Sequence, residues 1–229
     1  MTSVVRSGAR GLPCYLVLDT SQSMSPYEKL LTDTLQEIYD TLITSPQMME
    51  FIHLSILEFN TRPQVIAGMI NLDALDNVPV VSCKGATNYA PMFDKVRERI
   101  DIDVPNLAEA RINVLRPVVF LLTDGEPTDQ STEVWTAALA RLTDPAWRRH
   151  PHVITYGFGD ASETVLTRVA TLAAYVAEEG TSNSEALTLA LSSMLHSMVT
   201  SAQSRQLQIP ESVLGMRTLA VANNDYINP

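Results

Sequence analysis

The stretch Leu16-Val17-Leu18-Asp19-Thr20-Ser21-Gln22-Ser23 is an apolar strand pattern that ends abruptly in an acid followed by alternating hydroxyls. Apolar residues run without interruption from Cys14 to Leu18, as in a central strand that is buried on both faces of a sheet. The residues after the strand offer only oxygen atoms, which are the ligands that a hard cation such as Mg2+ prefers. By itself, however, the segment favours a turn or a helix cap.

The composition indicates a chain with one domain and a tail. Its 229 residues are 45% hydrophobic, which is enough to bury a substantial core. The formal net charge of -10 argues against nonspecific binding to nucleic acid or to an anionic membrane, because both favour surfaces rich in Lys and Arg. Cys14 and Cys83 belong to no C-x-x-C pair, so we expect two buried free thiols rather than a disulfide.

The chain shows no targeting or membrane signal. Residues 1–10 carry positive charge, but no apolar run of signal-peptide length follows them. No later segment approaches the ~18 uninterrupted apolar residues of a membrane span. We therefore expect a cytoplasmic protein.

Hydrophobic periodicity predicts alternating strands and helices, and hence a doubly wound α/β fold. The sheet is expected to be mostly parallel, with helices on both faces. The turn at residues 60–63 permits a hairpin, which would place one antiparallel strand at an edge. Strands are expected at 14–18, 53–59, 64–70, 118–122, 152–158 and 171–177, and helices at 25–45, 89–100, 131–142, 163–170 and 184–204.

Three local predictions depend on caps and prolines. Ser25 and Glu28 form a capping-box pattern at the start of the first helix. Residues 103–116 are expected to be a loop with a short helix, because prolines stand near both of its ends.

The predicted boundaries are a lead-in at 1–11, the domain at 12–204, and a C-terminal tail at 205–229. That tail is extended or docks through apolar residues. The apolar residues are Val213, Leu214, Leu219, Val221 and Tyr226.

Two later segments resemble the opening one in character. In Lys84-Gly85-Ala86-Thr87-Asn88-Tyr89 a glycine-containing loop places a threonine hydroxyl just before a helix, where it also suits an N-cap. In Val119-Phe120-Leu121-Leu122-Thr123-Asp124-Gly125-Glu126-Pro127 a second buried strand ends in an acid. Ligands of open parallel sheets gather outside the carboxyl ends of the strands, near the point where the strand order reverses. Asp19 and Asp124 both stand at such ends.

Taken together, these residues resemble the metal-ion-dependent adhesion site of von Willebrand factor A domains. The D-x-S-x-S of that family matches Asp19, Ser21 and Ser23, its loop threonine matches Thr87, and its acid after the fourth strand matches Asp124. The resemblance covers roughly residues 12–204 and implies the Rossmann-like fold of that family. Residues 12–21 and 117–129 look like the first and fourth strand segments of TerY-like bacterial proteins, which are associated with tellurium resistance and stress.

The resemblance implies a binding role. Ser21 and Ser23 would ligate the ion directly, Thr87 directly or through water, and Asp19 and Asp124 mostly through bound waters. Without a carboxylate of the chain among its direct ligands, the ion can accept a Glu or Asp from a partner protein. We therefore expect a metal-dependent protein-interaction module and not an enzyme, with Mg2+ as the ion and Mn2+ or Ca2+ as alternatives.

The same resemblance suggests the surroundings of the site and its partners. The expected rim of the partner-binding surface consists of Asn88, Tyr89, Glu126 and Asp129. Similarity to the TerY-like proteins implies a scaffold in a stress system, whose candidate partners are a protein kinase and a phosphatase of that system. Neither nucleic acid nor membrane is expected as a partner.

Three alternatives are less well supported by the residues. A Mg2+-dependent phosphoryl-transfer enzyme of the haloacid-dehalogenase type also has an aspartate after its first strand, but it needs a second acid where this chain has Ser21. An extracellular adhesion domain lacks a visible signal peptide and a plausible disulfide. His150 and His152 are compatible with a fragment of a zinc site, yet no cysteine or acid lies at ligand spacing, so we expect a solvated strand entrance.

Overall fold

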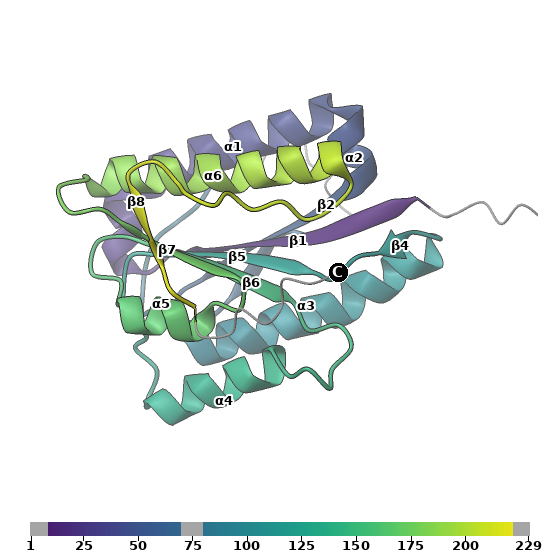
Figure 1. Ribbon diagram of the computed structural model, residues 1–229. Coiled ribbons are helices and arrows are strands. Elements are labelled where there is room, and N and C mark those ends of the chain that lie inside the picture. Colours follow the sequence, from purple (N-terminus) through teal and green to yellow (C-terminus); the bar gives the residue numbers. More distant parts are fainter. Residues whose placement is uncertain (1–8, 70–79, 222–229) are drawn as a thin grey trace, which may run out of the picture.

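A sheet with five parallel strands at its centre organises the computed structural model, which describes residues 9–69 and 80–221 (Figure 1). The order is β3-β2-β1-β5-β6-β7-β8, and β4 pairs with the start of β1. The parallel strands are β1 (Arg10–Asp19), β2 (Ile52–Phe59), β5 (Val118–Thr123), β6 (His152–Gly157) and β7 (Ala173–Ala177). The remaining strands are β3 (Gln64–Ala67), β4 (Asn113–Val114) and β8 (Met216–Leu219).

Both edge strands are antiparallel to their neighbours. β3 pairs with β2, which confirms the predicted antiparallel edge. β8 pairs with β7 at the opposite edge and was not predicted, because it lies in the segment that was expected to be a tail.

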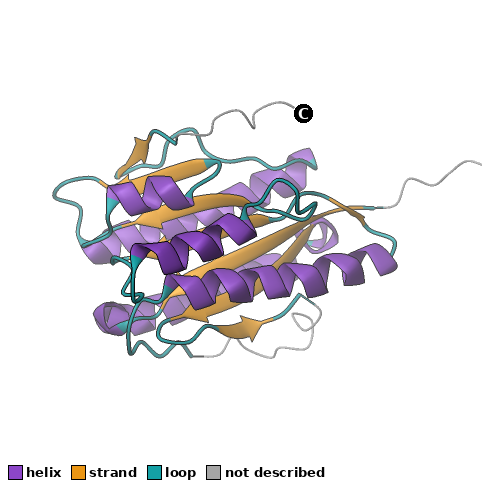
Figure 2. Ribbon diagram, turned by 90° about the horizontal axis from the view of Figure 1, so that it is seen from below, coloured by secondary structure: helices purple, strands orange, loops and turns teal. Residues whose placement is uncertain are grey.

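Helices cover both faces of the sheet (Figures 1 and 2). One face carries α1 (Glu28–Thr44), α2 (Pro46–Phe51) and α6 (Asn183–Ser204), and the other carries α3 (Tyr89–Glu109), α4 (Thr132–Leu142) and α5 (Glu163–Val169). Side chains of β1 alternate between the two cores: Leu16 packs on the α1 and α6 side, and Val17 on the α3 and α4 side. Burial on both faces explains why β1 is apolar at successive positions. Among the helices described, none combines the length and the apolar character needed to span a bilayer.

Two local predictions about helices were wrong. Residues 103–116 were predicted as a loop with a short helix, but residues 103–109 continue α3 up to Glu109, with Pro105 inside it. Val104 continues the apolar face of this helix onto the core, and that burial offsets the hydrogen bond that proline cannot make. The predicted capping box is absent: a 3-10 helix, η1 (Gln22–Tyr27), precedes α1, and Glu28 instead accepts a hydrogen bond from the backbone N–H of Cys83 at 2.7 Å.

The segment after α6 docks on the domain. The Tyr175 hydroxyl donates to the backbone oxygen of Pro210, and the Ser197 hydroxyl donates to that of Gln208. Val213 and Leu219 are buried, whereas Leu214 is 85% exposed. Residue 226 lies outside the described residues. The two cysteines are free and buried, as predicted.

The strand order creates a topological switch point between β1 and β5. From β1 the chain passes through α1 and α2 to β2 on one side, while β5 lies against β1 on the other side. The direction of strand addition therefore reverses between β1 and β5, which is where ligands of such sheets bind. Asp19 ends β1, and Asp124 directly follows β5.

Candidate metal centre

Asp19 is a completely buried carboxylate that joins the ends of β1 and β5. Its Oδ1 accepts a hydrogen bond from the backbone N–H of Ser21 at 2.9 Å, which closes the turn after β1. Its Oδ2 accepts from the hydroxyl of Thr123, the last residue of β5, at 2.6 Å. Both oxygens are therefore fixed, and the loop that begins at Asp19 has a defined position relative to β5.

The two predicted serines form a chain of hydroxyls that leads to Asp124. Ser23 Oγ donates to Asp124 Oδ1 at 2.8 Å, and Ser21 Oγ lies 3.0 Å from Ser23 Oγ. A hydroxyl has one hydrogen to donate, and Ser23 uses its own on Asp124, so Ser21 must be the donor to Ser23. Both hydroxyl hydrogens thus point towards Asp124. The lone pairs of Ser21 Oγ remain available to a cation.

The loop that carries Thr87 is fastened against the loop after β1. The Lys84 N–H donates to the Thr20 oxygen at 2.8 Å, and the Gln22 N–H donates to the Gly85 oxygen at 3.1 Å. Gly85 has φ +76°, and a Cβ there would lie 2.4 Å from the hydroxyl oxygen of Thr61. Only glycine suits this position, where the loop that carries Gly85 closely approaches the loop between β2 and β3 that carries Thr61.

Thr87 lies beside the turn that follows β5. Its backbone N–H donates to Thr128 Oγ1, and its oxygen accepts from the Thr128 N–H, both at 2.9 Å. A Cβ on Gly125 would lie 3.9 Å from Thr87 Oγ1. The threonine hydroxyl is thus next to the Asp124–Gly125 backbone, and the side chain is 5% exposed. The five residues predicted to form the site meet at one end of the sheet.

Neither acid of the cluster has a counter-ion within residues 9–69 and 80–221. Burial raises the pKa of Asp19 to about 6, against the lowering effect of its hydrogen bonds from Thr123 and Ser21, and the nearby charge of Asp124 raises it further. Burial also raises the pKa of Asp124. Neither acid belongs to any of the ion pairs found among the described residues.

This donor set suits a hard cation. Within residues 9–69 and 80–221, no group of three or more His, Cys, Asp or Glu side chains is arranged to hold a metal. A cation here would therefore depend on the hydroxyls as well as on the two carboxylates. An oxygen-only set of this kind matches the preferences of Mg2+, Mn2+ and Ca2+ and offers nothing to a thiophilic metal.

The predicted rim needs one correction. Tyr89 is fully buried, with its ring edge-on to those of Phe59, Phe93 and Trp135, so its side chain is part of the core and cannot contact a partner. Glu126 is exposed, as a rim residue must be.

The other two predicted rim residues, Asn88 and Asp129, are only partly exposed and already have partners within the chain. Both carboxylate oxygens of Asp129 accept backbone N–H groups at the start of α3, at 2.8 and 2.9 Å. The Asn88 side chain bonds to Thr61 and Thr128.

Two supporting residues were missed by the sequence analysis. Thr123 donates a hydrogen bond to Asp19. Asn60 joins three loops, because its side-chain Nδ2 donates to Thr20 Oγ1 at 3.2 Å and its backbone oxygen accepts from the backbone N–H of Asn88 at 3.2 Å. The sequence gave only a weak indication of the role of Thr123, which is a hydroxyl residue at the end of an otherwise apolar strand. Nothing in the sequence distinguished Asn60 from an ordinary turn residue.

Comparisons with known proteins identify the fold. No protein-family model and no curated protein matches the sequence. Solved structures do match, among them a von Willebrand factor type A structure from Catenulispora acidiphila. It aligns with 82% of this chain and 43% of its own, at 13% identity and a TM-score of 0.56.

Two further matches have lower TM-scores. The ArnB paralog VWA2 from Sulfolobus acidocaldarius has 18% identity over 84% of this chain and 45% of its own, with a TM-score of 0.48. Proximal thread matrix protein 1 from the mussel byssus, solved with a zinc-occupied MIDAS motif, has 18% identity over 71% of this chain and 39% of its own, with a TM-score of 0.43. This chain spans less than half the length of each of the three structures. At 13% identity the likeness to the Catenulispora acidiphila structure concerns the fold alone: the chain has the von Willebrand factor A fold.

Proposed function

We propose that this chain is a metal-dependent protein-interaction module whose metal centre consists of Asp19, Ser21, Ser23, Thr87 and Asp124. One observation carries the proposal: two buried acids, neither of them in an ion pair among the described residues, lie among three hydroxyls at the switch point of the sheet. Mg2+ is the proposed ion, with Mn2+ or Ca2+ as alternatives. When bound, the ion would compensate the two carboxylates and offer a coordination position to a Glu or Asp of a partner protein.

The residues of the chain prepare the centre for that role. Asp124 accepts the hydrogen of Ser23, which in turn accepts that of Ser21, so the serine lone pairs are oriented before any ligand arrives. Asp19 is fixed by Ser21 and Thr123. Ser23 is exposed, which leaves the centre accessible to a side chain from outside.

The state of Asp19 also supports a binding role over catalysis. A nucleophilic carboxylate needs a free oxygen that a substrate can reach. Asp19 is 0% exposed, and both of its oxygens accept hydrogen bonds. We therefore propose that the protein is not an enzyme.

We propose further that the module is a cytoplasmic scaffold in a bacterial stress or tellurium-resistance system, with a kinase and a phosphatase as its candidate partners. The support for this finer role is the likeness of residues 12–21 and 117–129 to TerY-like segments. Glu126 is the predicted rim residue whose side chain is most available to such a partner.

Metal binding is tested first, by calorimetric titration of Mn2+ into the wild type, Ser23→Ala and Ser25→Ala. Ser25 lies in the same segment, outside the hydroxyl chain, so its substitution is a matched control. We expect one Mn2+ per chain, at least tenfold weaker binding by Ser23→Ala, and no change for Ser25→Ala. Added acetate should lower the water-proton relaxation enhancement of the bound Mn2+, because a carboxylate replaces water. Absence of Mn2+ binding, or equal losses in the two variants, would contradict the proposed centre.

Partner binding is tested separately, with the immobilised chain and an extract of the native cell. Proteins retained in Mg2+ should be lost in EDTA and on the Ser23→Ala chain. Retention that is equal under all three conditions would show that the partner does not use the metal centre.

A further inference from the structure

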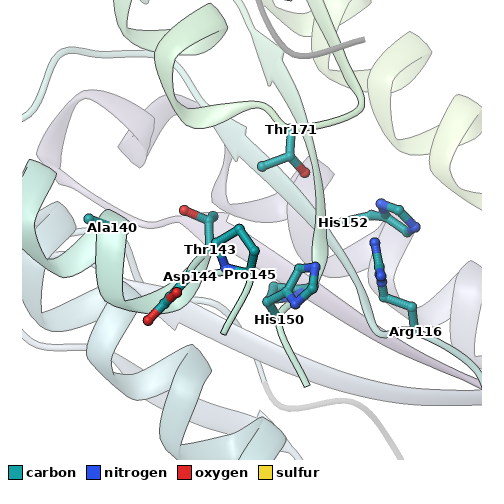
Figure 3. A pocket seen from close by; sticks show the side chains of 9 residues that line it. Arg116, Ala140, Thr143, Asp144, Pro145, His150, His152 and Thr171 are labelled. Atoms are coloured by element: carbon teal, nitrogen blue, oxygen red, sulfur yellow. The ribbon is translucent and has the colours of Figure 1, made fainter. Parts of the chain in front are cut away.

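The cavities of the protein differ in their distance from the metal centre. One of about 350 Å3 opens at the amino ends of β5 and β6, where Arg116, His150 and His152 lie along one side of it (Figure 3). Six residues of β5 separate this cavity from the metal centre, which is roughly 20 Å at about 3.3 Å per residue. A partner residue close to a metal-bound acid does not reach it.

Another cavity, of about 290 Å3, lies beside the metal centre between α4 and α5, and we name it the α4–α5 groove. Both helices follow parallel strands, so both begin at the end of the sheet where the centre lies (Figure 1). Glu126, from the loop after β5, also lines the groove. It is two residues from Asp124, a span of at most about 7 Å of extended chain. A segment that places an acid on the metal therefore passes the mouth of this groove.

Arg168 brings an uncompensated cation to the groove. Its Cζ lies 5.5 Å from the centroid of the Trp135 ring, within the range of a cation–π contact. Among the described residues its guanidinium takes part in no ion pair and no hydrogen bond. Its charge lowers the pKa of Glu133, but a hydrogen bond from Ser131 lowers that pKa more, and Glu133 is exposed to water. The N–H groups of Arg168 are thus available to a ligand.

The indole N–H of Trp135 is a second available donor. Trp135 lines the groove and is only 4% exposed. In the part of the chain that the structure describes, its N–H makes no hydrogen bond, and it is not one of the sealed, unsatisfied atoms of the core, so solvent reaches it. An indole N–H can only donate, as can a guanidinium. Two neighbouring donors of this kind call for an acceptor from the ligand, and a carboxylate accepts from both.

We propose that the α4–α5 groove binds a second acidic side chain of the partner, close in sequence to the acid that completes the metal centre. This inference rests on the proposed function. The carboxylate of the second acid accepts from Arg168 and Trp135. Pro127 and Val165 also line the groove and are half-buried, so they offer apolar surface to the methylene groups of a glutamate.

The dimensions of the groove limit the spacing of the two acids. From Ser162 to Arg168 the chain advances roughly 9 Å at about 1.5 Å per residue. With the span of at most about 7 Å from Asp124 to Glu126, the far end of the groove lies roughly 16 Å from the centre, or about five residues of extended chain. The charge of Glu126 disfavours a second acid directly beside the first. We therefore expect the acids to lie about two to five positions apart.

The test uses the full chain in Mg2+ and capped peptides in which one to four glycines separate an aspartate from a glutamate. Each peptide has a matched partner with glutamine in place of the glutamate. Binding is followed through the indole N–H NMR signals of the two tryptophans, assigned with Trp147→Phe. At the best spacing we expect the glutamate peptide to bind at least fivefold more tightly than its glutamine match. The Trp135 signal should shift saturably, and the Trp147 signal should not.

Matched arginine variants separate the groove from general electrostatics. Arg168→Gln should bind the two peptides equally, whereas Arg148→Gln, which removes the same charge from an exposed position outside the groove, should keep the preference. Equal binding of the two peptides by the wild type, a preference that survives in Arg168→Gln, or no peptide binding at all would overturn the proposal.

Two further measurements separate the groove from the metal centre. Calorimetry should find the same Mn2+ affinity in the wild type, Arg168→Gln and Arg148→Gln, so normal Mn2+ binding without a peptide preference contradicts the groove alone. A preference that depends on Arg168 and is unchanged in EDTA would instead support an acid-binding groove and contradict the metal-bridged contact.

Discussion

Replacing Asp19 by asparagine should stabilise the metal-free protein, although Asp19 is central to the proposed site. The folded-state pKa of about 6 lies above the ordinary 3.8 because the carboxylate is buried, and the nearby charge of Asp124 raises it further. At about 1.4 kcal/mol per pH unit, ionised Asp19 therefore costs the folded state roughly 3 kcal/mol at pH 7.5. Asparagine keeps the shape of the side chain and removes this cost. Its amide can donate to Thr123, whose hydroxyl can turn to the Gly125 oxygen at 3.3 Å.

The sign of the pH dependence follows from the raised pKa. The folded state holds its proton more tightly than the unfolded state, so the wild type is most stable with respect to this group below about pH 4 and loses stability as the pH rises through about 6. The asparagine variant has no such loss. The difference between the two proteins in EDTA should thus grow from about 1 kcal/mol at pH 4.5 to roughly 3 kcal/mol at pH 7.5.

Metal should reverse the order of stability. A divalent ion at a thousand times its dissociation constant adds about 4.1 kcal/mol to the wild type and little to Asp19→Asn, which exceeds the deficit of roughly 3 kcal/mol. Urea denaturation at pH 4.5, 6 and 7.5, with EDTA and with Mn2+, measures both effects. Glu37→Gln, an exposed charge change on α1, is the control and should behave as the wild type. The reasoning fails if the wild type in EDTA is as stable as the variant at pH 7.5, or if the variant keeps the full stabilisation by Mn2+.

Two further substitutions test the frame around the centre. Gly85→Ala should lower the free energy of unfolding by about 1–2 kcal/mol for its left-handed backbone and by a further ~1–3 kcal/mol for the clash with Thr61. It should also weaken Mn2+ binding. Gly180 has φ +88° and open space around it, so Gly180→Ala carries only the first of these costs. Equal losses of stability for Gly85→Ala and Gly180→Ala in urea denaturation would contradict the predicted clash with Thr61. Asp129→Ala should lose about 1–2 kcal/mol, because it exposes two N–H groups at the start of α3, yet calorimetry should find Mn2+ affinity within about threefold of the wild type.

The fold was largely predictable because its central parallel strands are buried on both faces. The parallel strands β1 and β5 appear in the sequence as continuous apolar runs. The predictions failed where tertiary contacts outweighed local preferences. Pro105 lies inside a helix because burial of that helix face offsets the missing hydrogen bond. β8 was missed because a four-residue edge strand has no periodicity of its own and exists through its pairing with β7.

The grouping of the acids and hydroxyls of the candidate site was predictable from the sequence, and the residues that support them were less so. Asp19, Ser21 and Ser23 are close in sequence, so their proximity follows from chain geometry alone. The rim was partly wrong because Tyr89 looked like a surface residue in a loop, whereas the aromatic cluster beneath that loop buries it. Asp129, predicted as a partner contact, caps α3 from a distant loop.

By itself, the sequence determined which segments are buried strands and that acids and hydroxyls follow two of them, because burial and side-chain chemistry are local properties of the residues. Only the tertiary structure decided that β1 and β5 are neighbours, and hence that Ser23 meets Asp124 across 101 positions of sequence. It also decided that Asp19 is completely buried and that Arg116, His150 and His152 share a cavity. Such properties depend on which segments pack together, and that is set by the strand order of the whole sheet.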